Sequence, residues 1–267
     1  MRGPKVAARR IDNDGAGPRS GMTVGQLNLR EQRSRTVKAS ERVAQEIVRD
    51  IVRRGLETGD HLPLEAAMVE EYGVSRTSLR EALRLLEVQG LISLKPGPGG
   101  GPVVGTVEPA HLARTAALYF HLSAAKYGDV MDAQVLMEST CARLAARNPD
   151  REDLMAPWLA QSFPEDTPTF RDITTGFHGA VYDAAGNPVL SLLTQAVSHI
   201  VTQHVVRTMD PVELRAPIVD EHAELARVIA SGDADRAEAM MAEHFESQHA
   251  YLRTRSPARI EENIQWR

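Results

Sequence analysis

The sequence predicts a mainly α-helical protein in which three helices and a two-stranded hairpin precede an all-helical bundle. Apolar residues recur at helical spacing from Ser40 to about residue 90, and again from Pro109 to about residue 253. Between these stretches the pattern changes to short runs typical of strands. With 267 residues, the chain is long enough for one large domain or two ordinary ones with buried cores.

The composition excludes several classes of protein. Hydrophobic residues make up 42% of the chain and charged residues 25%, as in soluble globular proteins. A single cysteine excludes a disulfide framework, and no apolar run approaches the ~18 residues that a membrane span needs. The first 21 residues lack the apolar stretch of a secretory signal, so we expect a cytoplasmic protein with no membrane partner.

The net charge of −5 conceals an uneven distribution along the chain. Residues 1–38 hold nine Lys or Arg and three Asp or Glu, residues 39–106 hold eight and ten, and residues 107–267 hold fourteen and twenty-three. A basic arm, a nearly neutral middle and an acidic body predict that different parts of the chain meet different partners.

The first hundred residues divide into an arm, three helices and two strands. Residues 1–36 are rich in Gly, Pro, Arg and Ser without a hydrophobic period, which predicts a disordered basic arm, and Met22 is an alternative start. Capping residues and glycines then bound three predicted helices, at 40–55, 63–73 and 75–90. Residues 91–95 and 103–107 are predicted as short strands on either side of a Gly- and Pro-rich loop.

From Pro109 onward the pattern predicts a bundle of six or seven helices. A weaker helix is expected at 151–162. Capping residues mark the starts of the other helices, at Asp129, Thr167-Pro168, Asn187-Pro188, Asp210-Pro211 and Asp233.

Helix, helix, tight turn, helix and two-stranded wing form the plan of a winged helix-turn-helix. In that plan the first residues of the third helix enter the major groove of DNA, where Arg can grip guanine and Ser or Thr can reach phosphates or bases. Exposed arginines that are simply solvated are the plainer alternative. The candidate DNA-binding residues are Ser75, Arg76, Thr77, Ser78, Arg80, Arg84 and Lys95. The Gly-rich loop is not expected to bind a nucleotide, because it lacks the Lys of a phosphate-binding loop and joins two strands.

Residues 59–65 (Gly-Asp-His-Leu-Pro-Leu-Glu), 72–83 and 86–92 closely resemble the N-terminal domain of GntR-family transcription regulators. This resemblance implies a homodimer that binds a pseudo-palindromic double-stranded DNA operator and acts as a repressor. Two positions depart from the family pattern. Leu64 stands where the family usually has a Ser that caps the helix, and Ala66 lies where it often has a basic residue.

Three of the nine histidines lie beside apolar residues in predicted helices, namely His178, His222 and His244. Three imidazoles from three helices can hold Zn²⁺ or a similar ion, although a buried, hydrogen-bonded role for each histidine is the plainer interpretation. Their surroundings resemble the helical effector-binding domain of the FadR subfamily, the FCD domain, over residues 107–252. That resemblance implies a divalent metal held by an Asp and these three histidines. Thr174 occupies the usual Asp position, so one carboxylate is missing.

The same resemblance implies a small-molecule effector beside the metal site, possible effectors being carboxylates or acyl compounds. Members often have an Arg one turn before Glu138, where Gln134 stands here, so the charge-assisted grip on a carboxylate is lost. The expected effector is therefore less anionic, held by the metal, or larger and more apolar. The pocket candidates are Gln134, Glu138, Ser198, His199 and Thr202.

These patterns together predict a ligand-responsive DNA-binding transcription regulator and not an enzyme. The expected segments are a basic arm, a DNA-binding domain, an effector-binding and dimerisation domain and a tail, at 1–36, 37–106, 107–253 and 254–267. Two alternatives are a helical metalloenzyme with an accessory DNA-binding domain and an architectural DNA-binding protein without an effector.

Overall fold

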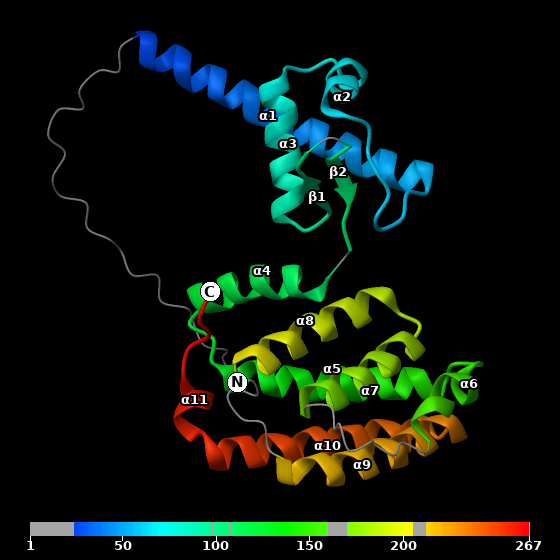
Figure 1. Cartoon of the computed structure of the whole chain (residues 1–267). Coiled ribbons are helices and arrows are strands. Elements are labelled where there is room, and N and C mark those ends of the chain that lie inside the picture. Colours follow the sequence, from blue (N-terminus) through cyan, green and yellow to red (C-terminus); the bar gives the residue numbers. More distant parts are fainter. Residues whose placement is uncertain (1–23, 98, 107, 160–169, 205–211, 267) are drawn as a thin grey trace, which may run out of the picture. The chain divides into compact units, whose positions relative to one another are not determined.

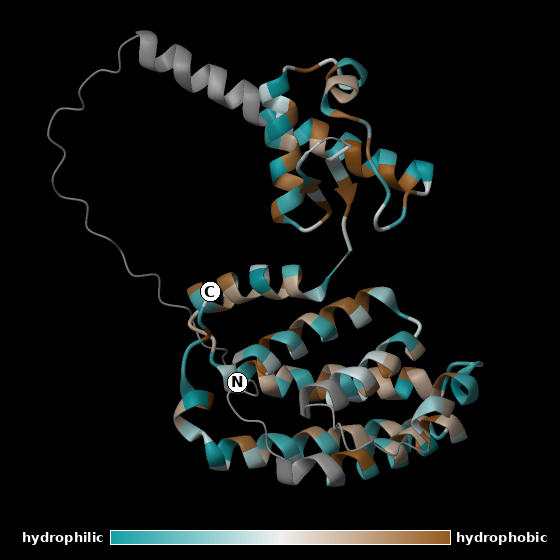
Figure 2. Ribbon diagram, viewed as in Figure 1, coloured by the Kyte–Doolittle hydropathy of each residue, from teal (hydrophilic) through white to brown (hydrophobic). Residues whose placement is uncertain are grey.

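The computed structural model describes residues 24–97, 99–106, 108–159, 170–204 and 212–266. The chain forms two compact units, an N-terminal unit that ends at Thr106 and a C-terminal unit that begins at Val107 (Figure 1). Each unit buries a hydrophobic core of its own, and around the helices hydrophobic residues alternate with hydrophilic ones (Figure 2). None of the described helices is both long enough and apolar enough to cross a membrane.

Three helices and a small antiparallel sheet build the N-terminal unit. In chain order the elements are α1 (Val24–Arg54), α2 (Glu65–Tyr72), α3 (Arg76–Val88), β1 (Ile92–Lys95) and β2 (Gly101–Val104). Ile92 pairs with Val104 and Lys95 with Gly101. The second strand therefore begins two residues earlier than the sequence predicts. α1 packs against α3 over a core in which Ile47 and Leu83 are fully buried.

The first helix starts much earlier than expected. α1 begins at Val24, so residues 24–36 are helical and the prediction of a disordered arm is wrong for them. Ser40 lies inside this helix and is buried, so it is not its cap. Residues 24–36 contain one glycine and no proline and are rich in residues that favour helices. Extending an anchored helix avoids the cost of nucleation, so no hydrophobic period is needed.

The helices α2 and α3 start in different ways. α2 begins at Glu65 and not at Pro63, and its N-cap residue is Leu64, which makes no side-chain capping bond and is 64% exposed. α3 is capped as predicted, because the Ser75 hydroxyl oxygen accepts the backbone N–H of Ser78 at 3.1 Å. The start of α2 is therefore the weaker of the two.

The C-terminal unit is an all-helical bundle. Its described elements are α4 (Pro109–Leu122), α5 (Tyr127–Ala146), α6 (Arg151–Met155), the 3₁₀ turn η1 (Ala156–Trp158), α7 (Phe170–Ala184), α8 (Pro188–His204), α9 (Val212–Ser231), α10 (Ala234–Arg255) and α11 (Pro257–Glu261). α5 is the central helix and contacts α7, α8, α9 and α10. This arrangement turns the inward faces of several helices toward one region of α5.

Some of the helix boundaries predicted for this unit are confirmed and others are wrong. Asn187 and Asp233 cap α8 and α10, since their side chains accept backbone N–H groups of the first turn. Asp129 is not the N-cap of α5, which begins at Tyr127. Its carboxylate instead accepts the N–H of the true N-cap residue, Lys126, at 2.8 Å. The weaker helix at 151–162 is shorter than predicted and continues as η1, and the Thr167-Pro168 and Asp210-Pro211 signals lie outside the described residues.

The end of the chain is part of the bundle, although the sequence marks it only as a tail. Ile260 and Ile264 are buried against the second hydrophobic cluster of the C-terminal unit. The N–H of Ile264 donates to Ala125 O at 2.9 Å, and Ile264 O lies 2.7 Å from His121 Nδ1. The last residues therefore fasten the corner between α4 and α5.

Candidate functional site

The start of α3 presents an exposed cationic face in the N-terminal unit. Ser75, Arg76, Thr77, Arg80 and Arg84 are exposed there, as is Lys95 at the end of β1. Ser78 is the exception among the predicted DNA-binding residues, because only 6% of it is exposed and its hydroxyl lies 3.0 Å from that of Ser75. Ser78 therefore stabilises the start of the helix instead of extending outward.

Arg80 is held by an acidic partner on the neighbouring helix. Its Nε donates to Glu65 Oε2 at 2.9 Å, from a side chain that is 64% exposed. An exposed ion pair of this kind contributes little stability. The pair holds Arg80 toward α2, whereas Arg76, one turn earlier on α3, is exposed.

The wing is a tight loop between β1 and β2 that depends on glycine. Gly97, Gly99 and Gly101 have positive φ angles of 94°, 79° and 130°, which side chains rarely allow. A Cβ at Gly100 would lie 2.2 Å from Lys95 O, so the loop closes too tightly for any side chain at that position. The glycines that the sequence marks as a loop thus make a compact tip next to Lys95.

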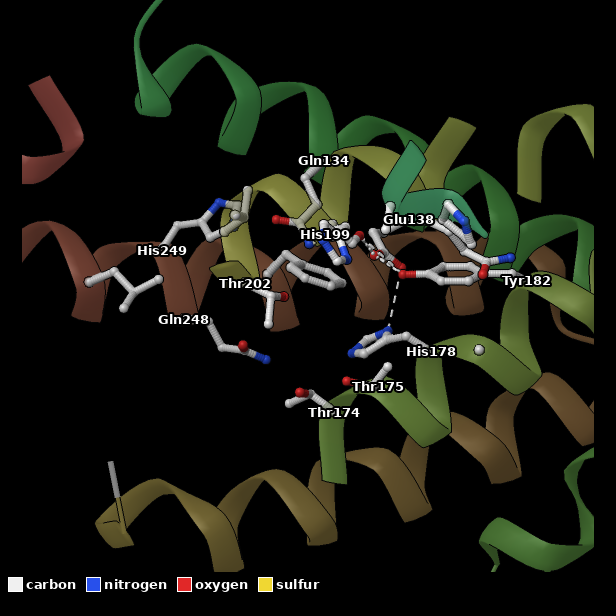
Figure 3. A pocket seen from close by; sticks show the side chains of 18 of the residues that line it. Gln134, Glu138, Thr174, Thr175, His178, Tyr182, His199, Thr202, Gln248 and His249 are labelled. Atoms are coloured by element: carbon white, nitrogen blue, oxygen red, sulfur yellow. Dashed lines mark hydrogen bonds and ion pairs between the residues drawn. The ribbon is translucent and has the colours of Figure 1, made fainter. Parts of the chain in front are cut away.

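A cavity of about 370 Å³ opens between α5, α7, α8 and α10 in the C-terminal unit. All five predicted effector-pocket residues line it, together with Thr174 and His178 (Figure 3). The lining is Glu108, Pro109, Ala110, Gln134, Glu138, Thr174, Thr175, His178, Gly179, Tyr182, Gln195, Ser198, His199, Val201, Thr202, Phe245, Gln248, His249 and Leu252. The size suits a small metabolite.

A buried carboxylate organises the polar wall of the cavity. Glu138 is completely buried, and its Oε1 accepts hydrogen bonds from the Tyr182 hydroxyl and, at 2.8 Å, from the Ser198 hydroxyl. Ser198 in turn accepts the side-chain amide N–H of Gln134 at 3.0 Å. Burial, and then the charge of Glu138, raise the pKa of Tyr182 well above its usual value, so the phenol stays a proton donor. This chain of bonds fixes the orientation of all four side chains.

The three predicted metal-ligating histidines come together beside this wall. His178 on α7, His222 on α9 and His244 on α10 are all buried, and one nitrogen of each lies within 4.8 Å of the others. Nε2 of His222 is 3.3 Å from Nε2 of His244. Thr174, at the position of the missing carboxylate, lines the cavity one helical turn before His178.

The histidine cluster fits a divalent ion by its donor chemistry. Burial, followed by the neighbouring histidines, lowers the pKa of His222 well below its usual value, and burial also lowers that of His244. Both are therefore neutral imidazoles, the form that binds a metal. Nδ1 of His244 lies 2.7 Å from Glu221 Oε2, an arrangement in which a carboxylate turns the opposite ring nitrogen inward.

Several residues at this site were not predicted from the sequence. Tyr182, Gln248 and His249 line the cavity, and Glu221 orients His244. Gln248 lies four residues after His244, and its amide Nε2 is 2.6 Å from His244 Nε2. Helical spacing could have found Tyr182 and Gln248, each one turn after a predicted histidine, whereas nothing in the pattern distinguishes Glu221 from a surface carboxylate.

The N-terminal unit is a winged helix-turn-helix, and the C-terminal unit is a helical bundle with a polar cavity. Together they define the class of ligand-responsive DNA-binding transcription regulators. Family models match both parts. The model for bacterial regulatory proteins of the gntR family covers residues 39–100, and the FCD domain covers residues 129–247. The chain belongs to the GntR family of transcription regulators and carries an FCD domain.

Individual relatives agree with this assignment. The chain is 28% identical over 208 residues to the Exu regulon transcriptional regulator of Escherichia coli K12, which covers 73% of this chain and 76% of that protein. It is 25% identical over 252 residues to the transcriptional repressor NanR of Edwardsiella tarda, covering 86% and 91%. The solved Streptococcus agalactiae GntR shares the fold with a TM-score of 0.54 at 18% identity, over 79% of this chain and 99% of that one. These relatives are named as regulators and not as enzymes, so the metalloenzyme alternative is not supported.

Proposed function

We propose that this regulator is a homodimeric repressor of the FadR subfamily that binds a pseudo-palindromic operator and releases it when an effector fills the cavity. The observation that carries this proposal is the cavity lining, which includes Glu108, Pro109 and Ala110 at the start of α4. These residues follow Thr106, the end of the N-terminal unit, almost directly in the chain. A ligand in the cavity would therefore lie beside the chain segment that leads to the DNA-binding unit.

Dimer geometry gives that contact its effect. A dimer must place two recognition helices in two half-sites about one turn of DNA apart. A ligand that favours one position of residues 108–110 changes the free energy of that placement and lowers operator affinity. Because its target is DNA, we place the protein in the cytoplasm.

Within this proposal, DNA is bound by Ser75, Arg76, Thr77, Arg80, Arg84 and Lys95, with Ser78 supporting the helix start. The exposed arginines at the start of α3 are suited to base edges in the major groove. Arg84, one turn later, and Lys95, beside the wing, are suited to phosphates.

We also propose that His178, His222 and His244 hold a divalent ion such as Zn²⁺. When bound, the ion supplies a Lewis-acid position for an oxygen atom at the edge of the cavity. Glu221 orients His244, and Thr174 contributes at most a neutral oxygen. The test is the metal content of purified full-length protein, compared with that of His222→Ala. Equal content in the two proteins would contradict the site.

The effector proposal is tested by filling the cavity. Thr202→Trp places a large side chain in the cavity and leaves the α3 face untouched. The operator affinity of this variant, measured by fluorescence anisotropy on the footprinted promoter sequence, should stay within about threefold of the wild-type value. Metabolites from a cell extract should no longer change that affinity. Thr254→Trp, at an exposed position of α10, is the matched control. An unchanged response in the Thr202 variant would contradict the proposal, and sedimentation of the free protein as a monomer would contradict the dimer.

A further inference from the structure

The charge of the cavity wall is unusual for a site that binds a carboxylate. Its described lining contains two glutamates, Glu108 and Glu138, and neither lysine nor arginine. His249 does not supply the missing charge, because burial, and then the nearby Arg253, lower its pKa to about 4. Apart from the divalent ion proposed on the three histidines, a carboxylate bound here would lie near the buried charge of Glu138 without a cationic side chain of the described lining to offset it.

The wall also has hydrogen-bond acceptors to spare. Gln134 Oε1 is buried without a hydrogen-bond partner among the described residues. Glu138 Oε2 is also buried and makes no hydrogen bond with the described residues, but it lies 3.4 Å from His178 Nδ1 (Figure 3). The amide of Gln134 is already committed, because its N–H donates to Ser198. A buried acceptor without a donor costs free energy, so Gln134 Oε1 in particular favours a ligand that brings donors. Hydroxyl groups donate hydrogen bonds, and an ionised carboxylate does not.

The rest of the lining is matched to a molecule without charge. Thr175, Gln195, Thr202 and Gln248 contribute neutral hydroxyl and amide groups, which can both donate and accept. Glu138 is already stabilised by the hydroxyls of Tyr182 and Ser198 and so does not need an ammonium group.

We propose that the effector of this regulator is an uncharged polyhydroxylated molecule, a sugar or a sugar alcohol, whose hydroxyl groups donate to Gln134 and Glu138. The inference rests on the proposed role of the cavity as the effector site. Gln134 is then the residue that determines specificity, since an arginine at this position would add the cation that the cavity lacks.

The test compares matched probes that differ at a single functional group, which changes their charge. Titration calorimetry on the full-length protein would use sorbitol against gluconate, glucose against glucuronate, and glucosamine as the cationic probe, with metal removed and with Zn²⁺ added. We expect the uncharged member of a pair to bind at least tenfold more tightly than its acid. Tighter binding of the acid in either metal state, or binding of glucosamine alone, would overturn the inference.

Two variants make the assignment specific to this wall. Gln134→Arg should reverse the preference toward the acid by at least tenfold, while Thr254→Arg, which adds the same charge at an exposed position of α10, should leave it unchanged. Glu138→Gln, which removes the negative charge with little change in shape, should narrow the preference for the uncharged probe. An unaltered preference in both cavity variants would overturn the role of Gln134 and Glu138.

Binding and operator release are read separately, so the two proposals can fail separately. An uncharged probe that binds without changing operator affinity contradicts the proposed function and supports the ligand class. An acid that binds more tightly than its uncharged partner and lowers operator affinity supports the proposed function and contradicts the ligand class.

Discussion

Replacing Tyr182 by phenylalanine should destabilise the C-terminal unit by about 2–3 kcal/mol. The change removes one oxygen and leaves the buried ring in place. In the native protein this hydroxyl donates to Glu138 Oε1, and the Ser198 hydroxyl donates to the same oxygen. In the variant, Oε1 of this completely buried carboxylate keeps the Ser198 hydrogen bond, and Oε2 keeps its 3.4 Å contact with His178 Nδ1.

The magnitude follows from that loss. A hydrogen bond to a charged group contributes about 1.5–3 kcal/mol, and a buried group left with fewer partners adds to the cost. The cavity left by a single oxygen is small, so packing contributes little. For a unit of this size, about 2–3 kcal/mol corresponds to a fall in Tm of roughly 4–12 °C.

Thermal unfolding of the full-length protein by calorimetry provides the measurement. Tyr119→Phe is the matched control, because Tyr119 is 66% exposed on α4 and its loss of a hydroxyl should change stability by less than about 0.5 kcal/mol. In the Glu138→Gln background, where the charge is gone, Tyr182→Phe should cost at least about 1 kcal/mol less. If Tyr182→Phe matches the Tyr119 control, the hydroxyl does not stabilise Glu138 and the reasoning is refuted.

Three further predictions follow from other parts of the molecule. Leu64→Ser should supply the missing cap of α2 and stabilise the N-terminal unit by about 1 kcal/mol, as read from its calorimetric transition, and no gain would show that the cap is not limiting. Because His249 has a folded pKa of about 4, below its unfolded value, its neutral form contributes stability above about pH 6.5 that is lost as the pH falls toward 4. That contribution is about 3 kcal/mol, and His249→Gln, but not His61→Gln at an exposed site, should flatten the dependence of unfolding on pH. Arg76→Ala should cost about 1–3 kcal/mol of operator binding and relax specificity, and an equal loss on random DNA would rule out base reading.

The sequence predicts the N-terminal unit well because local signals agree there with the tertiary fold. Ser75 is followed by a helical apolar period, and it caps α3 in the structure. The same reasoning fails for Ser40, which is a good capping residue but lies inside α1. A capping residue shows where a helix can start, and the propensity of the residues before it decides whether the helix starts earlier.

The candidate cavity is predictable only in part. Gln134 and Glu138 are one turn apart on α5, so spacing alone places them on one face. Glu221 and His249 could not be assigned, because they meet the site through packing of α9 and α10 that no local pattern encodes. The unpartnered oxygen of Gln134 depends on a contact with Ser198, 64 residues away, and is visible only once the helices are assembled.

The fastening of the chain end to the α4–α5 corner gives α4 the mechanics of a lever. One end of this helix is pinned, since His121 and Ala125 contact Ile264 at that corner. The other end, at Pro109 and Ala110, forms part of the cavity wall. Fourteen residues of helix span about 21 Å, so a tilt of only about 5° about the pinned corner displaces the far end by about 2 Å. In the proposed function, a pivot of this kind would convert a small change in how the cavity is filled into a displacement of the chain segment that joins α4 to β2 of the N-terminal unit.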